Sequence, residues 1–419
     1  MQAISKILPK RISGEQLFML SVLVVNGGNY LYNLLMGRIL GPEKFADAAI
    51  LITFLLVLSF IAMTFQLVTA KFSVLFENGT LKRFIGRTYV HGALFGVFMG
   101  AAIFIFAPQL QQVFNTSTAI MFKVFGIGVP LYFLMSVNRG VFQGKKEFKS
   151  LSITYQGEML SRLVITFTLL FLSGLESSVV ISLGILISFG VGLVPFKYKN
   201  ISLSKHIAIS KAENKQVRNF FLLTAFYELT QIIINNSDIL LVKHYFASYE
   251  AGLYASLALI GRIVYFVAWM FVMLLLPTVV ALKKEGKPTA HVLFKYVGYI
   301  GAIALVIVLG CVLFPKTVIT ILFGSEYLSM APLLWKYAVA TAMFAISNIF
   351  AYYYLSLDKY VPVIISAIFG MLQVGLVAVF HKNLAQVVHM QIVAMAMLLI
   401  IQMIFFVISN RKEKRTIID

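Results

Sequence analysis

Apolar stretches of about 20 residues recur along almost the whole chain, and they constrain its fold more than any other feature. The composition agrees, since 60% of the 419 residues are hydrophobic and only 12% are charged. Membrane-spanning strands would be roughly half as long and would alternate polar and apolar residues, which these stretches do not. The sequence therefore predicts an all-α integral membrane protein with about 12 transmembrane helices.

The expected spans form two equal sets on either side of a basic segment. We expect an N-terminal six-helix bundle over residues 1–197, a cytoplasmic linker over 198–218, and a C-terminal six-helix bundle with a basic tail over 219–419. The halves look related, because Asn29 aligns with Asn235 and Leu34 with Leu240 at one offset. Weak repeats of this kind are typical of transporters built from pseudosymmetric halves, so we expect two pseudosymmetric bundles.

Lysine and arginine residues gather in the N-terminal segment, in every second connection and in the C-terminal tail. We assign Arg139 to the fourth, basic connection. The other connections contain Arg38, Lys44, Lys243, Lys316 and Lys382. Because positively charged loops stay in the cytoplasm, both termini are expected to be cytoplasmic. The net charge of +19 then reports membrane topology and does not imply nucleic acid as a partner.

The sequence contains no motif for catalysis, nucleotide binding or metal binding. Gly140–Lys146 lacks the spacing of a phosphate-binding loop, and neither H-E-x-x-H nor G-x-S-x-G occurs. The single cysteine excludes a disulfide framework, and the six histidines lack metal-ligand spacing. We therefore expect no enzyme activity, no catalytic residue, no metal and no cofactor.

Ionisable residues inside the expected spans are functional candidates, because a charge in the bilayer is costly unless it is paired or hydrated. Glu158 and Arg162 are four residues apart on one helix face and can pair. Glu228 and Arg262 lie on consecutive spans at similar depth, and we expect them to pair as well. Each pair is either a structural ion pair or part of a water-filled central cavity in which an arginine binds phosphate; both can hold for one pair.

Other intramembrane polar residues have two explanations each. Asp238, Lys123 and Lys336 lie nearer the outer ends of their spans, where a lysine can reach the interface. Polar stripes at corresponding places in both halves are explained about equally well by interhelical hydrogen bonds and by sugar contact. These stripes include Asn29, Asn235 and Asn236.

Glycines also mark one span. Gly92, Gly96 and Gly100 repeat every four residues, which predicts close approach of a neighbouring helix. The pair Gly126 and Gly128 lies beside Pro130 and indicates a kink more than a nucleotide site.

Several segments resemble one family. Gly37–Phe45 resembles the first outer loop of polysaccharide flippases of the MATE/MOP superfamily, the O-antigen and exopolysaccharide (Wzx-like) exporters. Ser237–Phe246, followed by Glu250–Ala255, is similar to the counterpart that opens the second half. Asn138–Gly144 and Leu322–Tyr327 also fit. The resemblance covers nearly the whole chain and does not identify the sugar.

The resemblance implies a flippase of the bacterial cytoplasmic (inner) membrane that acts in polysaccharide biosynthesis. Its substrate would be an undecaprenyl-diphosphate-linked oligosaccharide, moved to the outer leaflet by alternating access of two bundles. H+ and Na+ are the candidate coupling ions, with the membrane potential as the other candidate source of energy, and a polysaccharide polymerase and export machinery would be candidate partners. The expected substrate-binding residues are Arg162, Arg262, Lys123, Lys336, Asn29, Asn235 and Asn236. The candidate ion-coupling or charge-pairing residues are Glu158, Glu228 and Asp238.

Three alternatives compete with this prediction. A MATE-type cation-coupled drug antiporter would need an uncompensated acid in the first half, whereas Glu158 has Arg162 beside it. A membrane glycosyl polymerase or ligase would need a large outer loop with catalytic groups, and the outer connections are short. A membrane scaffold without transport would not need buried charges at matched depth.

Overall fold

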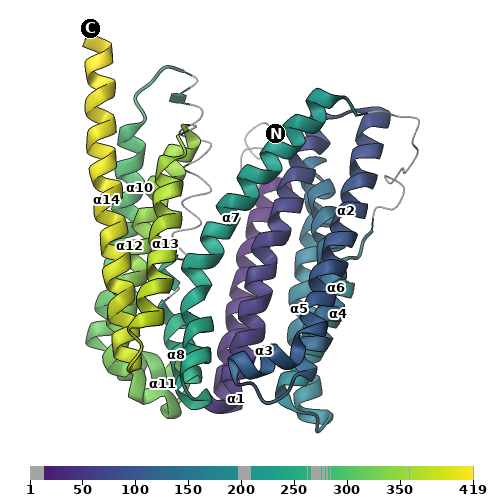
Figure 1. The fold of residues 1–419 in the computed structure, drawn as a ribbon, viewed down its shortest axis with the longest axis vertical. Coiled ribbons are helices and arrows are strands. Elements are labelled where there is room, and N and C mark those ends of the chain that lie inside the picture. Colours follow the sequence, from purple (N-terminus) through teal and green to yellow (C-terminus); the bar gives the residue numbers. More distant parts are fainter. Residues whose placement is uncertain are drawn as a thin grey trace, which may run out of the picture. The chain divides into compact units, whose positions relative to one another are not determined.

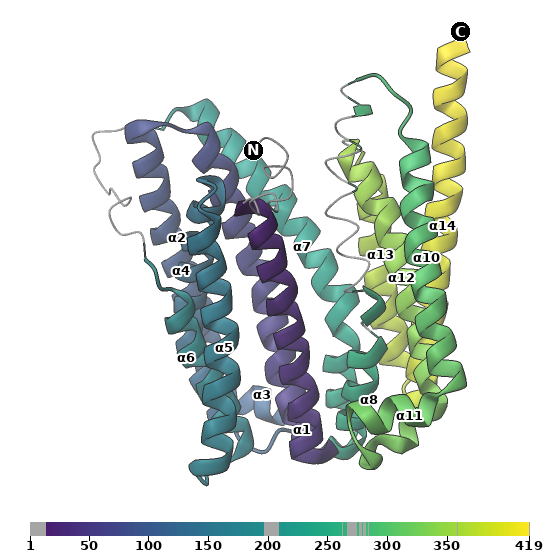
Figure 2. The ribbon, with the colours of Figure 1, turned by 180° about the vertical axis from the view of Figure 1, so that it is seen from behind.

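The computed structural model describes residues 14–196, 209–261, 263–265, 275, 279, 282–283, 285–357 and 359–418. Within these ranges the chain forms helices and no strand (Figures 1 and 2). The helices of the first half are α1 (Gly14–Leu75), α2 (Asn78–Ile105), α3 (Ala107–Phe114), α4 (Ile120–Gly144), α5 (Phe148–Leu172) and α6 (Ser177–Gly192). The later ones are α7 (Lys211–Tyr245), α8 (Ser248–Gly261), α10 (Ala290–Leu313), α11 (Pro315–Leu322), the 3-10 helix η3 (Ser325–Met330), α12 (Ala331–Ser356), α13 (Val361–Val379) and α14 (Leu384–Ile418).

Eight of the described helices are long and apolar enough to cross a membrane. Three further expected spans correspond to α5, which carries Glu158 and Arg162, to the shorter α6, and to α8, beyond which the chain is only partly described. The first two expected spans both lie within α1, which consists of two helical segments joined at a kink. The chain is thus a multi-pass membrane protein, and the prediction of an all-α integral membrane fold is confirmed.

Gly41 and Pro42 divide α1 and explain how it holds two spans. Gly41 has φ 71° and ψ 171°, in a region that a side chain with a Cβ rarely adopts. Pro42 follows it, and a proline is tolerated at the start of a helical segment because the missing N–H has no partner there. The chain therefore turns at Gly41 with no loop of its own between the two spans.

The chain forms two compact units, each described here by itself. Unit 1 consists of Met1–Tyr32, Leu58–Gln111 and Thr118–Ala225, and unit 2 of Asn33–Val57, Gln112–Ser117 and Phe226–Asp419. Both units thus take residues from α1 and from α7. Residues 197–208 of the expected linker lie outside the described part of the chain, so the predicted halves 1–197 and 219–419 remain a prediction.

In unit 1, glycines allow the backbones of α2 and α4 to lie in direct contact. A Cβ added to Gly96 would lie 2.8 Å from the Cα of Pro130, and one added to Gly126 would lie 2.7 Å from the carbonyl oxygen of Gly100. Both distances are too short for a real Cβ contact, so a side chain at either position would push the helices apart. The predicted close packing of the glycine stripe on α2 is confirmed.

In unit 2, the segments that carry the family resemblance lie against one another. The Tyr327 hydroxyl donates to the carbonyl of Gly37 at 2.7 Å, and Nη1 of Arg38 donates to the carbonyl of Ile321 at 2.9 Å. Gly252 on α8 packs directly on the carbonyl of Pro42, with no room for a Cβ. Figure 2 shows α8 and α11 at the same end of this unit. The resembling motifs of unit 2, which do not include Asn138–Gly144 of unit 1, therefore build one packed region.

A buried ion pair, which we call the Asp47–Lys243 clasp, completes this region. Lys243 Nζ lies 3.0 Å from Asp47 Oδ1, and its side chain is 1% exposed. Lys243 also donates to the carbonyl of Asn115 and to Ser248 Oγ, while the backbone N–H of Ser117 donates to Asp47 Oδ2. Lys243, which we assigned to a connection, lies instead near the C-terminal end of α7 and is buried.

Candidate functional site

Helices α4 and α5 of unit 1 bring two arginines onto one carboxylate. Arg139 Nη2 lies 2.8 Å from Glu158 Oε2, and Arg162 Nη1 lies 3.3 Å from Glu158 Oε1. All three side chains are at most 10% exposed. The i,i+4 pairing predicted for Glu158 and Arg162 is confirmed, and we call the three residues the arginine triad.

The other contacts of each guanidinium group are with neutral groups. Arg139 donates from Nη2 to the carbonyl of Thr154 at 2.8 Å and from Nε to Thr154 Oγ1 at 3.2 Å, and its Cζ lies 3.9 Å from the centre of the Tyr155 ring. Arg162 donates from Nη2 to Asn29 Oδ1, and its Cζ lies 5.6 Å from the centre of the Tyr32 ring. Carbonyl oxygens and ring faces attract a cation without neutralising it.

The arginine triad carries one more positive than negative charge. Within the described residues, the ion pairs of Arg139 and of Arg162 are both with Glu158. Taking an unneutralised cation out of water costs several kcal/mol, on the order of the full desolvation penalty of one ion. A site of this charge is chemically suited to bind an anion such as a phosphate through the planar donors of arginine.

Within the arginine triad, Arg139 is the residue that sequence reasoning missed. We expected it in a cytoplasmic connection, but α4 continues to Gly144 and the Arg139 side chain is only 3% exposed. A signal was present, because Gly140 and Gly144 are four residues apart. Cβ atoms at these glycines would lie 2.5 Å from the carbonyl oxygens of Gln66 and Ala70 on α1, so this stretch is packed inside unit 1.

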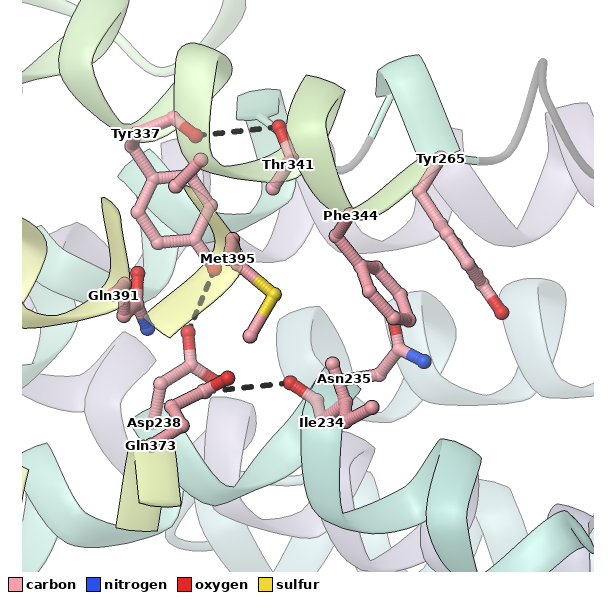
Figure 3. A pocket seen from close by; sticks show the side chains of 11 residues that line it. Ile234, Asn235, Asp238, Tyr265, Tyr337, Thr341, Phe344, Gln373, Gln391 and Met395 are labelled. Carbon is pink, nitrogen blue, oxygen red and sulfur yellow. Dashed lines mark hydrogen bonds between the residues drawn. The ribbon is translucent and has the colours of Figure 1, made fainter. Parts of the chain in front are cut away.

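A small pocket of about 30 Å³ lies in unit 2 and has Asp238 of α7 in its wall (Figure 3). Asp238 Oδ2 accepts hydrogen bonds from the hydroxyls of Tyr337 at 2.6 Å and Tyr254 at 3.1 Å. Gln391 Nε2 donates to the Tyr254 hydroxyl at 2.8 Å. Asp238 is therefore a buried carboxylate with two tyrosine hydroxyls among its hydrogen-bond donors.

The wall of the pocket also contains aromatic and amide side chains. Tyr265 and Phe344 stack with ring centres 5.3 Å apart (Figure 3). Gln373 and Asn235 add amides, of which Asn235 donates to the carbonyl of Gln231 in its own helix. Tyr254, Tyr337 and Gln391 were not anticipated, because polar residues within apolar spans become informative only when α7, α8, α12 and α14 are placed together.

The structure does not test the second predicted ion pair, between Glu228 and Arg262. Glu228 is buried on α7, but Arg262 lies outside the described residues, so their pairing remains a prediction. Asn236 is buried and donates to the carbonyl of Ile232 in its own helix. It is not among the residues that line the Asp238 pocket.

The two intramembrane lysines lie apart from these clusters. Lys123 is half-buried on α4, with Nζ 5.8 Å from the centre of the Phe104 ring. Lys336 is half-buried on α12, with Nζ 3.2 Å from His389 Nε2. Neither contact involves the arginine triad or the lining of the Asp238 pocket. Among the described residues, no group of three or more His, Cys, Asp or Glu could hold a metal ion.

Comparisons with solved structures show the fold. The structure of a multidrug resistance MATE family transporter of the MOP superfamily in an inward-facing conformation matches with TM-score 0.78 and 12% identity, over 92% of this chain and 95% of that one. The lipid II flippase MurJ in an inward closed conformation matches with TM-score 0.73 and 13% identity, over 94% and 87%. An outward-facing MATE transporter matches with TM-score 0.61 and 14% identity, over 97% and 98%.

No curated protein matches the chain in sequence. A family model does match, and it covers residues 35–332, which include the segments from Gly37 to Tyr327 on which the resemblance rests. The chain therefore belongs to the family described as "Polysaccharide biosynthesis protein".

Proposed function

We propose that the protein is a flippase that moves an undecaprenyl-diphosphate-linked oligosaccharide repeat unit across the bacterial cytoplasmic membrane. The head group crosses through the protein by alternating access of two helical bundles, while the lipid tail stays in the bilayer. The family description and the fold shared with a lipid II flippase support this proposal. The protein moves its substrate without a chemical step, in line with the absence of a catalytic motif from its sequence.

The observation that carries the proposal is the surplus positive charge of the arginine triad. A diphosphate head group is a strong hydrogen-bond acceptor, and a buried guanidinium binds such an anion through two parallel donors. Arg162 is the proposed contact, because Asn29, its partner on α1, is only half-buried and can be replaced as an acceptor by phosphate oxygen. Arg262, Lys123, Lys336, Asn235 and Asn236 remain further candidates for contact with phosphate or sugar.

Asp238 is the proposed coupling carboxylate. It lies in a pocket, and tyrosine hydroxyls that donate to it can remain in place when it gains or loses a proton or a cation such as Na+. Transport in one direction requires that this exchange change the relative free energy of the inward and outward states. Glu228 is a second candidate, and Glu158 serves charge pairing.

Both termini are proposed to be cytoplasmic, because the basic residues gather in the connections that would then face the cytoplasm. The polymerase and export machinery that consume the flipped repeat unit are the proposed protein partners.

The sidedness of the lipid-linked oligosaccharide tests the flippase proposal. In cells depleted of the protein, a membrane-impermeant glycan-binding probe should label inverted vesicles and fail to label right-side-out vesicles. Re-expression of the native chain should restore labelling of the right-side-out vesicles. An unchanged distribution after depletion would exclude the proposal.

A MATE-type antiporter of organic cations is the second candidate, because the Asp238 pocket combines a carboxylate with aromatic walls from Tyr265 and Phe344. Such a transporter would expel an organic cation dye from loaded cells, and a flippase would not. Dye efflux that is lost in Asp238→Asn, together with unchanged oligosaccharide sidedness, would favour this candidate.

A further inference from the structure

We propose that Arg139 is a positioning residue: it takes up the charge of Glu158 and thereby leaves the charge of Arg162 available to an anionic substrate. The inference rests on the proposed function, since it assumes that Arg162 contacts the phosphate of the transported head group. It assigns different tasks to two arginines that share one carboxylate.

The distances indicate which arginine Glu158 binds more strongly. Arg139 approaches Glu158 at 2.8 Å, whereas Arg162 approaches it at 3.3 Å. Charge-assisted hydrogen bonds are strongest near the shorter of these distances. The negative charge of Glu158 is therefore directed mainly to Arg139.

The surroundings of Arg139 fix its position. Every contact described above for Arg139 is to α5, through Thr154, Tyr155 and Glu158. Thr154 is fully buried, and the Nη2 donor of Arg139 is already shared between the Thr154 carbonyl and Glu158. Arg139 therefore ties α4 to α5 and is poorly placed to leave them for a substrate.

The other side of Glu158 and Arg139 is closed by α6. A Cβ added to Gly192 would lie 3.0 Å from the Glu158 Cβ and 3.4 Å from Arg139 Nη2. This helix thus packs directly on the Arg139–Glu158 pair. Arg162 differs, because it reaches toward α1 and the half-buried Asn29.

These roles predict that two double variants of equal net charge transport unequally, and that one single variant transports poorly. Arg139→Gln leaves Glu158 to neutralise Arg162, so the substrate concentration for half-maximal transport should rise about tenfold or more. Arg139→Gln/Glu158→Gln removes both members of the tighter pair and leaves Arg162 charged, so this constant should return to within about threefold of the native value. Arg162→Gln/Glu158→Gln has the same net charge but keeps only Arg139, and transport should stay low.

The experiment uses the full chain in proteoliposomes loaded with lipid-linked oligosaccharide, with thermal unfolding of each variant measured in parallel. A structural role for Arg139 would lower the unfolding temperature but would not produce recovery in one double variant alone. The proposal is overturned if both double variants recover equally, or if neither recovers although both fold. Arg139→Lys, which keeps the charge, should retain more transport than Arg139→Gln and covers the case in which Arg139→Gln does not fold.

The proposed function fails separately, if the native chain does not move lipid-linked oligosaccharide across the membrane of these proteoliposomes. If Arg162→Gln transports like the native chain, Arg162 does not contact the substrate, whatever the Arg139 variants do. If Arg162→Gln is inactive but the two double variants behave alike, only the division of tasks between the arginines is wrong.

Discussion

The candidate site of each unit contains a buried carboxylate, and different chemical groups contact the two carboxylates. Glu158 in unit 1 lies between the guanidinium groups of Arg139 and Arg162, whereas Asp238 in unit 2 accepts hydrogen bonds from the hydroxyls of Tyr254 and Tyr337. Arginine stays charged at any accessible pH, so the charge of the first site is fixed. The hydroxyls of Tyr254 and Tyr337 are neutral, and a hydroxyl can hydrogen-bond a carboxyl in either protonation state, so these two contacts do not fix the charge of the second site.

This difference in charge indicates which site suits substrate recognition and which suits coupling to an ion. A fixed surplus of positive charge selects an anion and does not respond to a gradient. A carboxylate whose charge can change is what coupling to H+ or Na+ requires. The comparison thus supports assigning substrate recognition to unit 1 and coupling to unit 2.

The largest expected effect concerns stability. Glu158→Ala leaves two buried arginines without their shared acid, and we expect it to lower the free energy of unfolding by about 3–5 kcal/mol. Asp238→Ala leaves neutral hydroxyls unsatisfied and should cost only about 1–3 kcal/mol. Thermal unfolding of the purified variants in one detergent would check this order. Equal losses for both variants would contradict the proposed difference between the sites.

The next effect concerns export. Arg162→Ala should reduce export about 10- to 100-fold, the loss expected for a charged hydrogen bond to substrate, with the amount of protein in the membrane near normal. Arg262→Ala is expected to act in the same direction. Export is measured as surface glycan per copy of the protein. If the variants fail to accumulate, the arginines serve as structural ion pairs.

At Asp238 we expect a substitution to change the coupling of transport to an ion gradient and to leave the fold intact. Asp238→Asn keeps an oxygen that can accept from Tyr254 and Tyr337, so the protein should fold with a loss of about 1 kcal/mol or less. Export should lose its dependence on an imposed proton or sodium gradient, while movement down the substrate gradient continues. Transport into vesicles with and without the gradient would measure this. A variant that still responds to the gradient would remove Asp238 from coupling.

The smallest effect is expected at Lys336, whose contact with His389 lies outside both buried sites as far as the structure describes the chain. Lys336→Ala should change the free energy of unfolding by no more than about 0.5 kcal/mol. Export should fall less than in Arg162→Ala, as measured in the same surface-glycan assay. A loss as large as that of Arg162→Ala would show that Lys336 contacts the substrate and would extend the recognition site beyond unit 1.

Much of the fold could be predicted, because the bilayer demands long apolar helices and leaves them visible in the sequence. The pairing of Glu158 with Arg162 could also be predicted, since it depends on spacing within one helix. The contact of Arg139 with Glu158 depends on how α4 packs against α5, and no local pattern encodes that. The same holds for the tyrosines around Asp238, which come from different helices.

The Asp47–Lys243 clasp joins residues that are far apart in sequence, and this has a consequence for biogenesis. Asp47 is synthesised and inserted long before Lys243, so the ion pair can close only after the beginning of the second half has entered the membrane. Until then Asp47 needs water or another partner. Gly252 must then pack on the carbonyl of Pro42. Incomplete chains would therefore expose an unneutralised acid, which offers membrane quality control a direct way to recognise them.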